Sequence, residues 1–126
     1  MHRPYDFRER SFLFARDIVG FCRVVARRDP ILRRLAIQLT DSGTSVGANL
    51  AEGVDGHSKP DFISRQVTAL KESGETRYWL RLITACEPSL AAQAAPLTQE
   101  ATEFVAMLTK SVKTARSSDS RGNKQA

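Results

Sequence analysis

Three small residues recur four positions apart within the segment QLTDSGTSVGANLAEG, residues 38–53: Gly43, Gly47 and Ala51. Residues four apart lie on one face of an α-helix, yet each glycine inside a helix costs about 1 kcal/mol relative to alanine. A helix through this segment therefore needs a compensating interaction. Close approach of a second helix provides one, because two backbones pack tightly where side chains are missing. The row is predicted to be a site of close helix packing.

A polar row runs beside the glycine row on the same predicted helix. Ser42, Ser45 and Asn49 are spaced so that they share a second face of the helix. Buried polar groups need hydrogen-bond partners, and a buried asparagine can set helix register or oligomeric state at a cost in stability. The expected role of this face is therefore assembly. The predicted polar network joins this helix to the next one through Ser45, Asn49, Glu52, Glu72 and Glu75.

Apolar residues at spacings of three and four predict helices along most of the remaining chain. Asp29-Pro30 and Glu87-Pro88-Ser89 interrupt the pattern, because a residue before proline is driven away from helical angles. Gly53 or Gly56 is expected to end the second helix in a left-handed conformation. The fourth helix has two possible starts: it begins at Ser89 and kinks near Pro96, or it begins at Leu97.

Four helices with short connections and no credible strand predict an all-α protein, an antiparallel up-and-down four-helix bundle. The bundle is expected to span residues 9–116. The expected segments are an initial stretch at 1–8, helices at about 9–28, 31–52, 59–86 and 89 or 97 to 114, and a flexible polar tail at 117–126.

The composition excludes several classes of protein. The 126 residues fit one domain, and 41% of them are hydrophobic, which suits a compact core. No apolar run approaches the roughly 20 residues of a membrane-spanning helix, and the charged N-terminus does not resemble a secretory signal. We therefore expect a cytoplasmic protein without membrane contact. Cys22 and Cys86 lie in apolar helical patterns without metal-ligand spacing and are expected to be buried.

Motifs that carry catalysis are missing from the sequence. Glu72 and Glu75 form an E-x-x-E pair that Glu52 could join at a metal ion, but metal-binding bundles use Glu-x-x-His motifs on two helices. The histidines, His2 and His57, fall in an end segment and a loop. Phosphate-binding glycine loops and nucleophile elbows are also absent. The sequence predicts no enzymatic activity, no cofactor and no metal.

Charge is distributed unevenly along the chain. Residues 1–34 carry nine arginines against four acidic residues, whereas residues 35–109 carry nine acidic residues against five basic ones. Residues 110–126 are again basic, with five basic residues and one acidic residue. Such asymmetry is typical of contact with nucleic acid or another polyanion. A solvated helix face with a soluble tail also explains it and is slightly favoured by charge alone, which leaves both interpretations open.

Four segments together resemble a known bacterial four-helix-bundle family: RSFLFARDIV (residues 10–19), QLTDSGTSVGANLAEG (38–53), SKPDFIS (58–64) and LKESGETRYWLRLI (70–83). That family includes proteins encoded in intervening sequences of large-subunit ribosomal RNA genes, and the accessory variability-determinant protein of diversity-generating retroelements. Two positions depart from its pattern. Asp41 stands where relatives commonly have a basic residue, and Gly74 where they commonly have alanine.

The resemblance implies a ring-shaped homopentamer of four-helix bundles without established enzymatic activity. It also implies two kinds of partner, namely nucleic acid and, in the retroelement member, a reverse transcriptase. Asp41 weakens any phosphate contact by its own segment, so we expect nucleic acid to bind elsewhere. In an antiparallel bundle the first and fourth helices can be neighbours, and their basic residues are expected to merge into one surface. The predicted contacts to RNA or DNA are Arg16, Arg23, Arg27, Arg28, Arg33, Arg34, Lys110, Lys113 and Arg116.

The functional hypothesis is a non-enzymatic oligomeric scaffold or accessory protein that binds RNA or DNA without reading its sequence. The alternative hypothesis is a protein–protein interaction module, whose positive charge serves only solubility.

Overall fold

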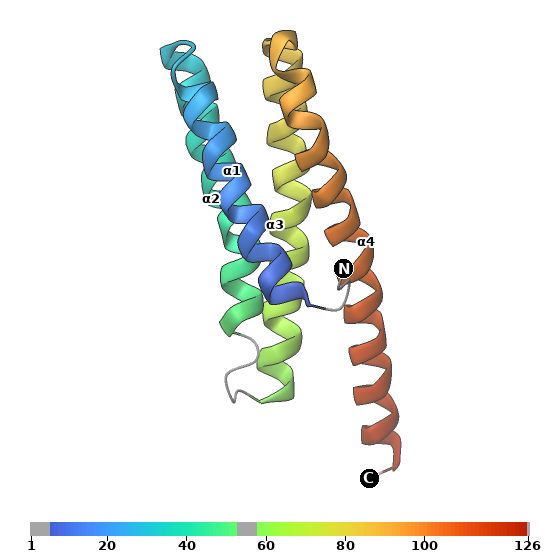
Figure 1. Cartoon of the computed structure of the whole chain (residues 1–126). Helices are drawn as coiled ribbons and strands as arrows, with labels where there is room; N and C mark the ends of the chain where they lie inside the picture. The colour runs from blue at the N-terminus through green and yellow to red at the C-terminus, as the bar shows by residue number, and fades with distance from the viewer. Residues whose placement is uncertain (1–5, 53–57, 126) are drawn as a thin grey trace.

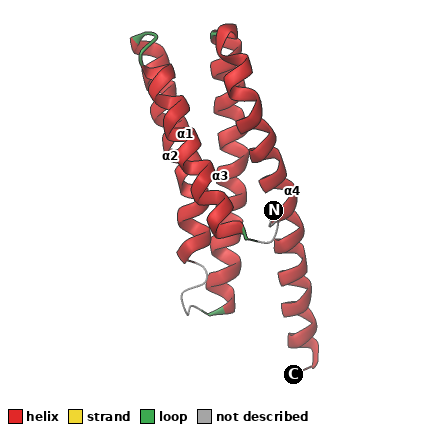
Figure 2. Ribbon diagram, viewed as in Figure 1, coloured by secondary structure: helices red, strands yellow, loops and turns green. Residues whose placement is uncertain are grey.

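The computed structural model describes residues 6–52 and 58–125, with side chains as far as Ser118. Every element in these residues is helical (Figure 2). Successive helices lie side by side and run in opposite directions (Figure 1). The all-α four-helix architecture predicted from the sequence is confirmed. The elements are α1 (Phe7–Ala26), α2 (Pro30–Glu52), α3 (Lys59–Cys86), the short 3-10 helix η1 (Pro88–Leu90) and α4 (Ala91–Gln125).

Short polar side chains fix the starts of the first three helices. The Asp6 carboxylate accepts a hydrogen bond from the Glu9 backbone N–H at 3.2 Å, so α1 begins two residues earlier than expected. Asp29 accepts from the Leu32 backbone N–H at 2.8 Å at the start of α2. Ser58 accepts from the Asp61 backbone N–H at 3.4 Å at the start of α3. The expected termination of α2 at Gly53 or Gly56 lies outside the described residues, as do residues 1–5.

The fourth helix begins two residues after the earlier of the two starts that the sequence left open. It begins at Ala91, after η1, and contains Pro96. Proline cannot donate to the Ala92 carbonyl, but Ala92 is exposed, so water can supply the missing donor. At the other end α4 continues past Thr114 to Gln125, across the segment expected to be a polar tail. That segment contains no proline and a single glycine, so nothing in it interrupts the helix.

The core lies between the helices along most of the bundle. Its fully buried side chains come from all four α-helices, and Phe14 meets Phe104 edge to face with ring centroids 5.4 Å apart. Cys22 belongs to this core, and burial raises the pKa of its thiol. Cys86 is exposed, so the expectation that both cysteines are buried is wrong for Cys86. It is the last residue of α3, where the helix leaves the core.

A largely buried arginine joins α1 to α4. Arg10 donates from Nη2 to Glu100 Oε1 and to Glu103 Oε1, both at 2.6 Å, and from Nε to Glu100 Oε2 at 2.7 Å. Its guanidinium carbon also lies 5.4 Å from the centroid of the Phe104 ring. The hydrogen bonds to Glu100 are the main cause that raises the pKa of Arg10. This cluster fixes how α1 sits against α4.

Candidate nucleic-acid interface

Arginines concentrate at the end of the bundle where α1 turns into α2. Five of them are exposed there, and the acidic residue between positions 23 and 34 is Asp29, whose carboxylate caps α2. Arg28 donates from Nη1 to Ser89 Oγ at 3.2 Å and lies 3.7 Å from Glu87 Oε1. The other four form no ion pair within the described residues. The arginine cluster, as we name it, comprises Arg23, Arg27, Arg28, Arg33 and Arg34.

The basic residues of α4 lie at the opposite end of the bundle. α4 runs antiparallel to α1 (Figure 1). Lys110 accordingly lines a groove together with Phe7, at the start of α1. At about 1.5 Å per residue, roughly 30 Å of helix separates Phe7 from Arg27. The expectation that the basic residues of the first and fourth helices merge into one surface is therefore wrong.

The remaining predicted contacts are Lys113 and Arg116 near Lys110, and Arg16 at neither end. Lys113 and Arg116 are exposed on α4 near Lys110 in sequence. Arg16 lies midway along α1, where its Nε donates to Asp17 Oδ1 at 3.1 Å and part of its charge is thereby offset. The two ends are thus separate positive regions of different composition.

The predicted polar network divides into two groups. In the first, Asn49 donates from Nδ2 to the Ser45 carbonyl at 2.8 Å and accepts from Arg65 Nη1 at 3.4 Å. Arg65 also pairs with Glu52 Oε2 at 2.7 Å, so it connects α3 to the end of α2. The Ser45 hydroxyl donates to the Asp41 carbonyl at 2.6 Å within its own helix. Arg65 was not among the predicted members, and its opposite charge to Glu52 is the signal that would have found it.

Glu72 and Glu75 form the second group on α3. Burial raises the pKa of Glu72, and the neighbouring Glu75 raises it further. Asp41 on α2 adds to this effect, whereas Lys71 opposes it. Groups of three or more possible metal ligands are absent from the described residues, so this pair is not part of a metal cluster there.

Two further hydrogen bonds join neighbouring helices. They use Ser42 of the predicted polar row together with residues that the sequence did not indicate. Thr76 donates from Oγ1 to Ser42 Oγ at 3.1 Å between α3 and α2, and Ser111 donates from Oγ to Gln66 Oε1 at 2.6 Å between α4 and α3. Every buried side-chain nitrogen or oxygen in the described part of the chain has a partner. The core therefore presents no unpaired polar group to a ligand there.

The glycine row lies against α1. A Cβ atom on Gly43 would lie 2.8 Å from Ile18 Cγ2, and one on Gly47 would lie 3.2 Å from the Ser11 carbonyl oxygen. Ala51, the third member, is exposed and lines a surface groove with residues from the start of α1. The structure thus brings the two glycines, but not Ala51, into the buried contact between α1 and α2.

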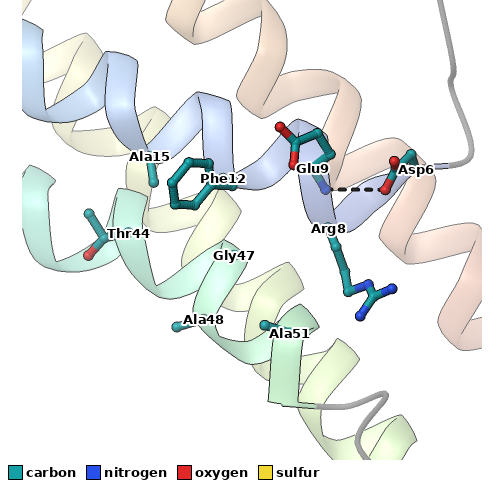
Figure 3. A pocket seen from close by; sticks show the side chains of 9 residues that line it. All are labelled: Asp6, Arg8, Glu9, Phe12, Ala15, Thr44, Gly47, Ala48 and Ala51. Atoms are coloured by element: carbon teal, nitrogen blue, oxygen red, sulfur yellow. Dashed lines mark hydrogen bonds between the residues drawn. The ribbon is translucent and has the colours of Figure 1, made fainter.

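An exposed groove of about 590 Å³ follows the outer side of the α1–α2 contact (Figure 3). Phe12 extends over the groove, and 65% of its surface is exposed. Small side chains form much of the lining because Gly47, Ala48 and Ala51 face α1 there. We call this the Phe12 groove.

Two further grooves lie on other faces. One, of about 550 Å³, lies between α3 and α4 and is lined by four alanines, Ala85, Ala91, Ala94 and Ala95, among other residues; we call it the alanine groove. The other, of about 540 Å³, lies where α1 and α3 begin, against the C-terminal half of α4. This lysine groove, as we name it, includes Phe7, Lys59, Phe62, Met107 and Lys110.

Within the described residues, the helices lack the length of apolar sequence needed to cross a bilayer. The three grooves differ in their lining. The alanine groove is lined mainly by small residues, the Phe12 groove by small residues and Phe12 with charged residues at the start of α1, and the lysine groove by apolar residues with two lysines.

Comparison with known proteins identifies related sequences and structures. The family described as 23S rRNA-intervening sequence protein matches residues 4–110. A crystal structure of a protein of unknown function from the S23 ribosomal protein family of Bacteroides thetaiotaomicron has 31% sequence identity and a TM-score of 0.75. The similarity covers 85% of this chain and 98% of that chain. No curated protein matches the chain.

Proposed function

The chain belongs to the 23S rRNA-intervening sequence protein family, and we propose that it is a non-enzymatic, oligomeric scaffold that binds RNA or DNA without reading its sequence. The observation that carries this proposal is the arginine cluster. Five exposed guanidinium groups lie around the turn that joins α1 to α2. Asp29 and Glu87 offset only part of their charge. Guanidinium groups bind phosphates through paired hydrogen bonds and remain charged at any physiological pH.

The geometry of the cluster favours contact with a phosphate backbone over contact with bases. Its arginines lie around the turn between α1 and α2, and none of them lines the Phe12 groove, the alanine groove or the lysine groove. Contacts of this kind hold nucleic acid electrostatically and do not distinguish sequences.

Assembly of several copies would multiply this surface. We propose that the Phe12 groove of one copy packs against the alanine groove of the next. The two grooves are different, lie on different helical hairpins and are both largely lined by small or apolar residues. Contacts between two different surfaces close into rings when the rotation between copies permits it. A pentameric ring, which the family resemblance implies, would present five arginine clusters and raise the avidity for a long polyanion.

Binding of fluorescently labelled RNA and DNA oligonucleotides tests this function. Two unrelated sequences of equal length are titrated with the protein, and anisotropy is read between 50 and 200 mM salt. We expect similar affinities for both sequences and a linear fall of log K with log salt concentration, as release of counterions requires. Absence of binding at the lowest salt, or an affinity independent of salt, would contradict the proposal.

A protein–protein interaction module is the competing function, and exposed apolar residues favour it. Ile31 and Ile37 are 68% and 55% exposed on α2, close in sequence to Arg33 and Arg34. A partner protein that covers these isoleucines would bury apolar area that neither proposed groove contact uses. Recovery of a stoichiometric protein from nuclease-treated lysate, undiminished when Arg23 and Arg27 are changed to glutamine, would favour this alternative.

A further inference from the structure

The lysine groove differs from the arginine cluster in having aromatic walls. Phe7 at the start of α1 and Phe62 in the first turn of α3 both line it, and both side chains are half-buried. Met107 on α4 adds to the apolar lining. The volume of about 540 Å³ lies within the roughly 300–1,000 Å³ of small-molecule pockets. A flat ring system fits such a site, since aromatic faces and a thioether contact rings favourably.

The charge of the lysine groove selects for an anion. Lys59 on α3 and Lys110 on α4 both line it. Lys59 donates to Ser118 Oγ at 3.4 Å, and neither lysine forms an ion pair with an acidic residue in the described part of the chain. The stretch of α4 from residue 104 to residue 118 contains three basic residues and no acidic one. A ligand that combines a flat ring with negative charge satisfies both features.

We propose that the lysine groove receives an unpaired base of a single-stranded nucleic acid, with Lys59 and Lys110 contacting the adjoining phosphates. This inference rests on the proposed function and names the form of nucleic acid that the protein prefers. Bases in a duplex are stacked on one another and cannot enter a groove, whereas an unpaired base can stack on an aromatic side chain. An acidic peptide without aromatic side chains would meet the same lysines but would gain no stacking on the aromatic rings.

Comparison of a single strand with a duplex tests this preference directly. The probes are a labelled oligoadenylate of ten nucleotides and an RNA duplex of ten base pairs, measured by anisotropy at 50 mM salt. We expect Phe62→Leu, which keeps the apolar surface but removes the aromatic face, to weaken single-strand binding about tenfold, in line with the stacking contribution of one base. Binding of the duplex should stay unchanged, and Phe62→Tyr, which keeps the ring, should bind the single strand like the wild type.

Two controls separate the groove from the rest of the surface. Tyr78→Leu removes an exposed aromatic side chain on the same helix outside the three grooves and should leave both affinities unchanged. Lys110→Gln should weaken single-strand binding and lower its salt slope by about one. Thermal unfolding of each variant verifies that it is folded.

The outcomes distinguish this inference from the proposed function. Salt-dependent binding that is equal for single strand and duplex, and insensitive to Phe62→Leu, would overturn the groove proposal and leave the proposed function standing. Competition by polyglutamate as effective as that by oligoadenylate, at equal charge, would likewise overturn it. Absence of binding to either probe would overturn both.

Discussion

Gly43 of α2 lies so close to Ile18 of α1 that a Cβ atom on Gly43 would come within 2.8 Å of Ile18 Cγ2 and 2.9 Å of Ile18 Cγ1. Ile18 is fully buried and branched at Cβ, so its side chain has few alternative rotamers. We expect Gly43→Ala to destabilise the protein, because overpacking of about 1–3 kcal/mol exceeds the gain of about 1 kcal/mol in helix propensity. The difference is a net loss of up to roughly 2 kcal/mol, which urea unfolding measures.

Gly74 provides the matched control for this substitution. It also lies inside a helix, but nothing outside its own helical backbone lies within 4 Å of a Cβ atom placed on it. Gly74→Ala should therefore stabilise the protein by roughly 0.5–1 kcal/mol. A Gly43→Ala variant as stable as Gly74→Ala would contradict the close contact with Ile18.

Sequence periodicity predicts the four helices because core positions recur at spacings of three and four, as in the series Leu32, Ala36 and Leu39. It also identifies Gly43 and Gly47 as packing positions, because glycine is unfavourable inside a helix unless a close contact compensates. Periodicity does not identify which polar residues meet. Arg10 and Glu100 are ninety positions apart, and their pairing depends on how α1 and α4 are placed. Periodicity likewise does not predict that the basic residues separate into two ends of the bundle. That separation follows from the antiparallel directions and the lengths of α1 and α4.

The pairing of Arg10 with Glu100 and Glu103 predicts a large effect of replacing the arginine. Arg10→Met keeps much of the side-chain volume but leaves two carboxylates without their shared donor. We expect a loss of about 1.5–3 kcal/mol, typical of hydrogen bonds to charged groups. Chemical denaturation measures this loss. Arg16→Met removes an exposed pair with Asp17 on the same helix and should change stability by less than about 1 kcal/mol; equal effects of both variants would contradict the assignment.

The raised pKa of Glu72 predicts a dependence of stability on pH. A folded-state pKa above the ordinary 4.5 means that the folded protein binds this proton more tightly than the unfolded chain does. The contribution of Glu72 is therefore fully favourable below that ordinary value and is lost as pH rises through the raised pKa. Glu72→Gln removes this loss. The difference in unfolding free energy between the variant and the wild type should therefore shift in favour of the variant as pH rises from 4 to 8.

Urea unfolding at both pH values measures the difference. Lys71 lowers the pKa of Glu72, so Lys71→Gln should have the opposite effect and steepen the loss of stability with rising pH. A difference between Glu72→Gln and the wild type that is the same at pH 4 and pH 8 would show that Glu72 titrates equally in the folded and unfolded states.

The arginine cluster predicts a change in the salt dependence of nucleic-acid binding. Arg23, Arg27 and Arg33 are exposed and have no ion pair among the described residues, so their replacement by glutamine should leave the fold intact. If each contacts one phosphate, the triple variant should lower the slope of log K against log salt by roughly two to three. Arg16→Gln, at a site where Asp17 already offsets the charge, is the control and should change the slope by less than one. An unchanged slope in the triple variant would place the contacts elsewhere.

The exposed ring of Phe12 predicts the effect of a single substitution on assembly. A contact between the Phe12 groove and the alanine groove would bury this side chain, which is 65% exposed in the isolated chain. A carboxylate at its place would lose its hydration against the alanines of the facing groove. Light scattering after size exclusion should give the wild type a mass several times 14.0 kDa, and Phe12→Asp should reduce it toward the monomer.

Tyr78→Asp changes an aromatic residue of similar exposure, 57%, outside both grooves and should retain the wild-type mass. A monomeric wild type would contradict the assembly itself, whereas an assembled Phe12→Asp variant would place the contact on another face of the bundle.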